Sequence, residues 1–121
     1  MMIELSDQAS DAILNALADL LDGGRIELLE TNGRALAVLR LSDPATAPAA
    51  SRELEFLEII EDDSASATGI VTTARIVGSG GFEIFSCDVG DENSDAVIKL
   101  NTTKIYCGGP VRLSSFRLAM P

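Results

Sequence analysis

The hydrophobic pattern of this chain changes its period once, at a pair of glycines near the N-terminus. Before Gly23-Gly24 the apolar residues follow a helical spacing, and from Arg25 onward apolar and polar residues alternate with a period of two. Such alternation places successive side chains on opposite faces of a β-sheet. The chain is therefore expected to form one helix and then strands only.

The segment before the glycines predicts an amphipathic helix from about Asp7 to Asp22. Ser6 is a favourable N-cap, and Asp7 and Asp11 suit the positive end of the helix dipole. One of the two glycines is expected to take the left-handed conformation that ends many helices. We expect the helix to cover an open end or edge of the sheets. Its apolar side chains recur at Ala9, Ile13, Ala16, Leu17, Leu20 and Leu21.

The rest of the chain, about residues 25–120, predicts seven or eight short strands. Asn32-Gly33 between residues 25–31 and 34–41 is a strong hairpin signal, because both turn positions tolerate positive φ. Residues 42–51, with two prolines, predict a loop or an irregular edge. The further strands are expected at residues 53–60 with a bulge at Leu57, 68–77 paired with 82–89 across a glycine turn, 96–101, 104–107 and 111–120.

Regular turns between short strands are typical of an antiparallel β-sandwich or jelly roll. At 121 residues the chain is expected to be one domain, residues 1–121, that folds without a metal or a disulfide. Only 4% of the residues are aromatic, so the core should consist of Ile, Leu, Val and Ala. The large side chains expected to fill it are Phe56, Phe82, Phe85 and Phe116.

The charge of the chain limits its partners. Nineteen acidic and nine basic residues give a net charge of −10, which repels phosphate backbones and anionic membranes. No apolar run approaches the roughly 20 residues that span a bilayer, and the start at Met1 carries no basic region of a secretion signal. We therefore expect a cytosolic protein that binds neither nucleic acid nor membrane.

No residue pattern predicts catalysis. Histidine, the usual base beside a nucleophilic serine or cysteine, is absent from the sequence, and Tyr106 is the only Tyr or Trp that could stack on a sugar. The turn Gly78–Gly81 is followed neither by a lysine nor by a helix, so it does not predict a phosphate site. The chain is expected not to be an enzyme and to use no cofactor.

Two further patterns resemble sites but favour simpler interpretations. Residues 91–95 alternate Asp, Asn and Asp as a calcium loop does, yet Ala96 and Thr102 stand where such a loop needs Gly and Glu. A turn, not a metal site, is therefore expected. Cys87 and Cys107 are expected to be reduced thiols, and a cross-strand bridge is the open alternative.

Charged residues on the expected strands are candidates for an interface. The arginines sit where their neighbours alternate apolar, so they point outward and either pair with carboxylates of the same chain or anchor a subunit contact. The acidic residues near position 53 form either a solvated face, a docking surface, or a guard against wrong strand pairing. The arginines are Arg40, Arg75, Arg112 and Arg117, and the acidic residues are Glu53, Glu55, Glu58, Glu61, Asp62 and Asp63, of which Glu53 and Glu55 are the chosen candidates.

Four collinear segments resemble a family of small proteins encoded among the virion-structure genes of tailed phages and prophages. The segments are residues 12–26, 36–44, 65–89 and 98–121. The third resembles a Thr-Gly, Arg, Gly and Phe series, and the fourth an Asn-Thr, Gly-Gly, Val, Ser-Phe and Pro series. They are matched here by Thr68-Gly69, Arg75, Gly80-Gly81, Phe85, Asn101-Thr102, Gly108-Gly109, Val111, Ser115-Phe116 and Pro121. The family's longer Pro/Ala-rich loop is replaced here by Asn32-Gly33.

The resemblance implies a virion component, with a capsid decoration, cement or minor capsid protein as the favoured role. Such a protein would bind the major capsid protein as a homotrimer on the capsid exterior, after assembly in the host cytoplasm. A tail or baseplate component, or a host-surface binding module, is the alternative. A cytosolic phage inhibitor of a host protein is the third interpretation.

Overall fold

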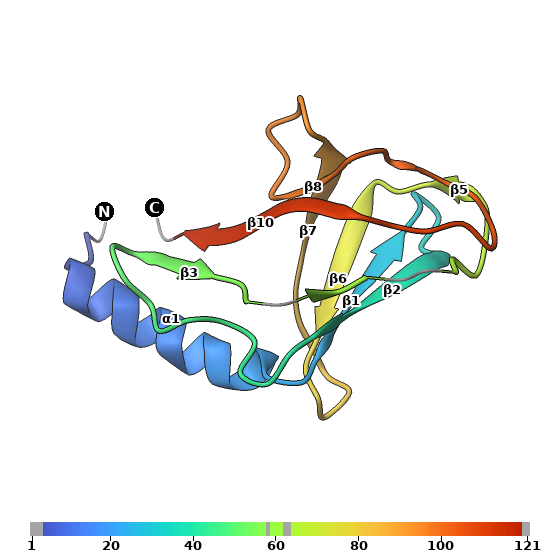
Figure 1. The fold of residues 1–121 in the computed structure, drawn as a ribbon. Coiled ribbons are helices and arrows are strands. Elements are labelled where there is room, and N and C mark those ends of the chain that lie inside the picture. The colour runs from blue at the N-terminus through green and yellow to red at the C-terminus, as the bar shows by residue number, and fades with distance from the viewer. Residues whose placement is uncertain (1–3, 58, 62–63, 120–121) are drawn as a thin grey trace.

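The computed structural model describes residues 4–57, 59–61 and 64–119, in which one helix is followed by ten strands (Figure 1). The expected strand end at Met120 and the matched Pro121 lie outside these residues. The elements are α1 (Asp7–Leu21), β1 (Arg25–Leu29), β2 (Ala35–Leu41), β3 (Glu53–Glu55), β4 (Ile59–Ile60), β5 (Gly69–Ile70), β6 (Thr73–Val77), β7 (Glu83–Asp91), β8 (Ile98–Leu100), β9 (Lys104–Ile105) and β10 (Leu113–Ala119).

Eight of these strands form one curled sheet in the order β3-β10-β8-β7-β6-β1-β2-β4, and β5 pairs with β9 in a second, two-stranded sheet. The hairpin predicted at Asn32-Gly33 is confirmed by the antiparallel pairing of β1 with β2, and the hairpin across the glycine turn by that of β6 with β7. The prediction of a mainly β fold with one N-terminal helix is therefore confirmed.

One pair departs from the antiparallel pattern, since β7 and β8 run parallel. Parallel neighbours usually need a long crossover, but here residues 92–97 suffice. The two strands pair over only three positions, from Val89 opposite Ile98 to Asp91 opposite Leu100. The connecting loop therefore has to run back along β7 by only about three residues before β8 begins. The amide of Val97 donates to Asp88 Oδ1 at 3.1 Å and holds the returning loop against β7.

The expected strand at residues 53–60 is divided into two. Its first part, β3, pairs with β10, and its second part, β4, pairs with β2 at the opposite end of the sheet order. The phase change at Leu57, predicted as a bulge within one strand, is the point where the chain leaves one edge and joins the other. The two edges of the curled sheet are thus formed by successive residues.

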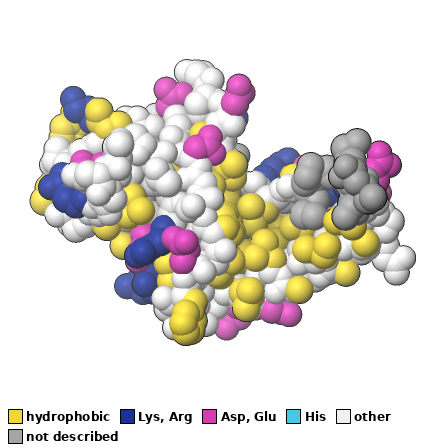
Figure 2. Space-filling model, turned by 180° about the vertical axis from the view of Figure 1, so that it is seen from behind, with side chains coloured by type: hydrophobic (Ala, Val, Ile, Leu, Met, Phe, Trp, Pro, Cys, Tyr) yellow, Lys and Arg dark blue, Asp and Glu magenta, His cyan; other side chains and the backbone are white. Residues whose placement is uncertain are grey.

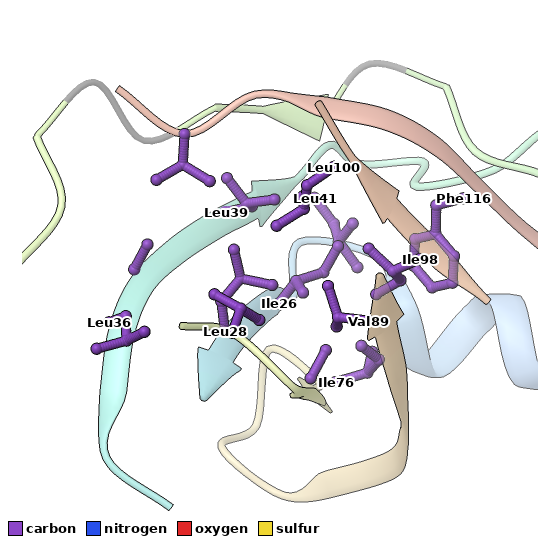
Figure 3. Packing of buried hydrophobic residues seen from close by; sticks show 14 of the residues in the cluster. Ile26, Leu28, Leu36, Leu39, Leu41, Ile76, Val89, Ile98, Leu100 and Phe116 are labelled. Carbon is purple, nitrogen blue, oxygen red and sulfur yellow. The ribbon is translucent and has the colours of Figure 1, made fainter. Parts of the chain in front are cut away.

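The core lies inside the curl and consists almost entirely of aliphatic side chains (Figure 3). Phe116 is buried and its ring stacks on that of Phe56, with centroids 4.1 Å apart. Phe85 packs partly buried against the core, whereas Phe82 is 81% exposed, so the prediction that Phe82 fills the core is wrong. Residues at the centre of the cluster include Ile26, Leu28, Leu36, Leu39, Leu41, Ile76, Val89, Ile98 and Leu100.

Both ends of α1 are formed as the sequence predicts. Ser6 Oγ accepts a hydrogen bond from the amide of Ala9 at 3.1 Å, and Gly23 takes the left-handed conformation with φ +70°. Gly24 is required for a different reason, because a Cβ there would stand 2.3 Å from the carbonyl oxygen of Val77. The glycine pair therefore brings the end of the helix directly onto the end of β6.

Candidate interaction surfaces

A row of polar side chains on α1 and at its C-cap orients the helix against the neighbouring loop. Asp11 and Asn15 lie four residues apart on α1 and so share one face, and Asp22 is the C-cap residue. Each accepts a backbone amide of the loop at residues 42–52, which runs between the helix and β3 (Figure 1). The bonds run from Arg52 N to Asp11 Oδ1 at 2.9 Å, from Ala49 N to Asn15 Oδ1 at 2.8 Å and from Ala45 N to Asp22 Oδ1 at 2.8 Å.

This orientation turns an apolar face of the helix outward. The buried helix residues are Ser10, Leu14 and Leu21, whereas Ile13 is 48% and Leu20 60% exposed. Three of the six apolar residues that defined the helix in the sequence, Ile13, Ala16 and Leu20, are thus exposed, and so is Ala12. The helix is apolar over more than half of its circumference, so its periodicity alone could not decide which stripe is buried.

Phe82 extends this apolar face beyond the end of the helix. It lies in the turn between β6 and β7, where Leu17, Leu20, Gly78 and Ile84 join it in lining a shallow groove. Seen from behind, hydrophobic side chains gather from the centre of the molecule toward the end that holds α1 (Figure 2). We call Ile13, Leu20 and Phe82, with the alanines between them, the helix face.

Other large apolar side chains are exposed away from the helix face. Ile60 lies in β4, and Leu57 lies shortly before that strand. Ile70 lies in β5, and Tyr106 directly follows β9. Because β4 is an edge strand of the large sheet and β5 and β9 form the separate two-stranded sheet, the exposed apolar side chains are spread over elements other than the helix.

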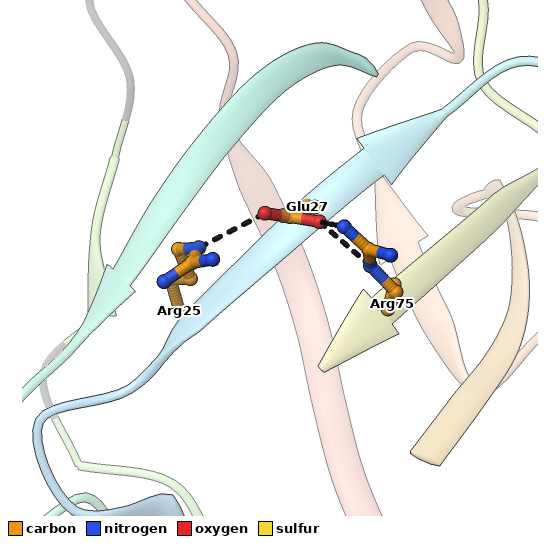
Figure 4. A network of polar contacts seen from close by, with 3 residues as sticks. All are labelled: Arg25, Glu27 and Arg75. Carbon is orange, nitrogen blue, oxygen red and sulfur yellow. Dashed lines mark hydrogen bonds and ion pairs between the residues drawn. The ribbon is translucent and has the colours of Figure 1, made fainter. Parts of the chain in front are cut away.

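A charged cluster occupies the outer face of β1 and β6 (Figure 4). Arg25 Nε donates to Glu27 Oε2 at 2.9 Å, and Arg75 Nε donates to Glu27 Oε1 at 2.7 Å, with a second contact from Arg75 Nη2. The Glu27 side chain is only 12% exposed. Burial raises the pKa of the Glu27 carboxyl, but the hydrogen bonds and positive charges of the two arginines outweigh this and hold its pKa below the usual value.

The predicted interface residues fall into two groups and one separate position. Arg40 on β2 is the cross-strand partner of Arg25 on β1. Arg75 on β6 is the partner of Glu27, two residues after Arg25, so Arg40 and Arg75 lie on the same face of the sheet. Glu53 and Glu55 lie exposed on β3, and Glu55 is the cross-strand partner of Arg117 on β10. Arg112 is exposed just before β10, apart from both groups. Glu58, Asp62 and Asp63 of the predicted acidic cluster lie outside the described residues.

Within the part of the chain that the structure describes, one of the four arginines predicted to point outward forms an ion pair and three do not. Arg75 pairs with a carboxylate of its own chain, Glu27. No ion pair joins Arg40, Arg112 or Arg117 to any other residue that the structure describes. Arg25 and Glu27 were not among the sequence candidates, although period-two spacing places them on one face and the Asn-Gly hairpin sets Arg25 beside Arg40.

The calcium-like segment forms a turn between β7 and β8. Asp91 Oδ1 accepts a hydrogen bond from the amide of Asn93 at 2.9 Å, so this carboxylate stabilises the turn itself. Across residues 4–57, 59–61 and 64–119, no group of three His, Cys, Asp or Glu side chains is placed to hold a metal ion. In the same residues, no helix is long and apolar enough to cross a membrane.

Both cysteines are free thiols. Cys87 lies half-buried on β7, and burial together with the charge of Asp88 raises its pKa to about 11. Cys107 is exposed and follows β9 instead of lying in a strand as predicted. The thiol of Cys87 is therefore almost fully protonated at neutral pH, which makes it a poor nucleophile.

The described surface thus offers two kinds of contact: exposed apolar side chains, above all on the helix face, and a group of arginines on the outer face of β1, β2 and β6. Both are features of protein interfaces, where apolar and arginine side chains are enriched. No family model, no curated protein and no solved structure matches this chain.

Proposed function

We propose that this protein is a structural component of a tailed-phage virion, and within it a capsid decoration protein that binds the lattice of the major capsid protein. The collinear resemblance of residues 12–26, 36–44, 65–89 and 98–121 to phage virion proteins supports the virion role. The decoration role is the one that the resemblance favours over a tail component, and exposed apolar side chains at separate places on a small β fold support it.

The observation that carries this proposal is the exposure of large apolar side chains at separate places on one fold. Phe82 at the helix face, Ile60 at β4 and Ile70 at β5 are 81%, 53% and 58% exposed. Apolar side chains that gather on one surface, as Phe82 and Leu20 do around the groove at the helix face, mark a surface that other proteins cover. A protein that bridges neighbouring subunits needs at least two such surfaces, since it must contact more than one partner at a time.

The mechanism is stabilisation by binding. A protein that binds the assembled lattice and not the separate subunits shifts the equilibrium toward the lattice by mass action. The net charge of −10 keeps the chain from adhering to the packaged nucleic acid. The arginines of β1, β2 and β6 provide a local positive surface for carboxylates of the capsid subunits.

The test is to locate the protein in intact particles. Antibodies raised against the purified chain should label heads in electron micrographs of particles produced by the phage or prophage that encodes it. Purified protein added to heads that lack it should bind in a saturable manner and raise the temperature at which they release DNA. Label confined to tails, or no label on any particle, would contradict the proposal.

A further inference from the structure

The outer face of α1 has a more specific spacing than a general amphipathic helix. Ala9, Ile13, Ala16 and Leu20 follow one another at intervals of four, three and four residues. This is the spacing of a seam along which one helix packs against another. Ile13, Ala16 and Leu20 are exposed, Ala9 is partly exposed, and none of the four is charged.

The order of side-chain sizes along this seam is self-complementary. In an antiparallel pair centred between Ile13 and Ala16, Ala9 lies opposite Leu20 of the second copy, and Ile13 lies opposite Ala16 of the second copy. Each large side chain then meets a small one, which allows close packing. In a parallel arrangement of two or three helices, Ile13 and Leu20 would each meet themselves and the alanines would leave gaps.

The helix dipoles favour the same direction. The positive end of the dipole lies near Asp7 and the negative end near the exposed Asp19. An antiparallel pair sets opposite dipole ends side by side, whereas a parallel pair would set like ends together. No side chain of α1 is positively charged, and Arg52 beside its N-terminus already pairs with Asp7 at 3.6 Å, so the pair relies on apolar packing and not on side-chain charge.

We propose that two copies of this chain pair about a two-fold axis through their α1 helices, with Phe82 extending the contact at each end. The proposal does not depend on a virion role, and it assigns a two-fold pair where the family resemblance implies a trimer. The seam from Ala9 to Leu20 is about 16 Å long at about 1.5 Å per residue. Its four residues, with Phe82, are far fewer than the roughly 20–30 residues that each partner contributes to a standard interface, so the pair is expected to dissociate on dilution.

Sedimentation equilibrium of the full chain over a wide concentration range tests the pairing. The wild type should fit a monomer–dimer equilibrium. Ile13→Lys should weaken association about tenfold or more, the equivalent of at least about 1.4 kcal/mol, because it buries a charge in the seam. Ile70→Lys is the matched control: Ile70 is also exposed, at 58%, but lies on β5, and its replacement should leave association unchanged.

A charge exchange tests the direction of the helices. Ala9→Lys and Leu20→Glu should each weaken pairing, and the double variant should recover it, because the introduced lysine then faces the introduced glutamate of the second copy. Within one helix the two positions lie about 16 Å apart, too far to pair with each other. Circular dichroism of every variant verifies folding. A wild type that is monomeric throughout, a trimer, or single variants that disrupt without recovery in the double variant would overturn the proposal.

Discussion

The carboxylate of Glu27 offsets the repulsion between the arginines on the outer face of β1 and β6. Its carboxylate lies between Arg25 and Arg75, and its side chain is far less exposed than theirs, at 12% against 39% and 46%. Without this charge, two guanidinium groups would share the face with Arg40 and no anion between them. The cluster thus stabilises the sheet while keeping a net positive charge at its surface.

Glu27→Gln should therefore lower the free energy of unfolding by about 1 kcal/mol at pH 7, a modest value because both arginines are partly solvated. The pKa of Glu27 is depressed in the folded protein, so its contribution is present above the unfolded pKa of about 4.3 and is lost as pH falls through the lower folded pKa. Urea denaturation from pH 7 to pH 3 should show the difference between variant and wild type shrinking. Equal effects of Glu27→Gln and of Glu83→Gln, a change on an exposed carboxylate, would contradict this.

Two serines on the first turns of α1 make opposite contributions. Ser6 Oγ caps the helix, whereas Ser10 Oγ is fully buried and has no hydrogen-bond partner among the residues that the structure describes. A buried hydroxyl without a partner loses its hydration with no compensation. Ser10 is therefore a position where a polar group is unfavourable in the folded state.

Ser10→Ala should raise the free energy of unfolding by about 1 kcal/mol, since it removes the buried hydroxyl and adds a better helix former. Ser6→Ala should lower it by about 1 kcal/mol through loss of the cap. Chemical denaturation that gives an unchanged m-value with shifted midpoints would measure both. A destabilised Ser10→Ala variant would mean that the hydroxyl has a partner in solution.

At the scale of the elements, α1 is held by its polar face as well as by its buried one. Asp22 accepts the amide of Ala45, a residue with no exposed surface. Asp22→Ala should cost about 1–3 kcal/mol, because it leaves that buried amide without its acceptor. Asp19→Ala, three residues earlier and exposed, should change stability by less than about 0.5 kcal/mol. Thermal or urea unfolding of the two variants side by side would distinguish them, and equal losses would contradict the role of Asp22.

The same elements show what the sequence could predict. Caps, glycines and the Asn-Gly turn act through neighbouring residues, so the helix ends and the β1–β2 hairpin were predictable. The division of residues 53–60 between opposite edges depends on contacts with β10 and β2, distant in sequence. The outward helix face likewise depends on the hydrogen bonds from loop amides to Asp11, Asn15 and Asp22. The spacing of apolar residues along the helix contains no information about these bonds.

At the scale of the whole molecule, residues 53–60 join the two edges of the curled sheet. Leu54 is fully buried on β3 opposite Leu118, and its loss should therefore loosen both edges. Leu54→Ala should cost about 2–5 kcal/mol, whereas Leu57→Ala, at a residue 47% exposed, should cost less than about 1 kcal/mol. Native-state hydrogen exchange should quicken in β10 and also in β2. Faster exchange in β10 alone would show that the two edges open independently.

The hydrogen bonds from Asp11, Asn15 and Asp22 to the loop have a consequence for how such a protein can evolve. Because they orient the helix, Ala9, Ile13, Ala16 and Leu20 contribute little to the stability of the fold. Substitutions at these four positions can accumulate without unfolding the chain. A lineage can therefore change its binding specificity through one helix face while the sheet, the core and the loop remain under their own separate constraints.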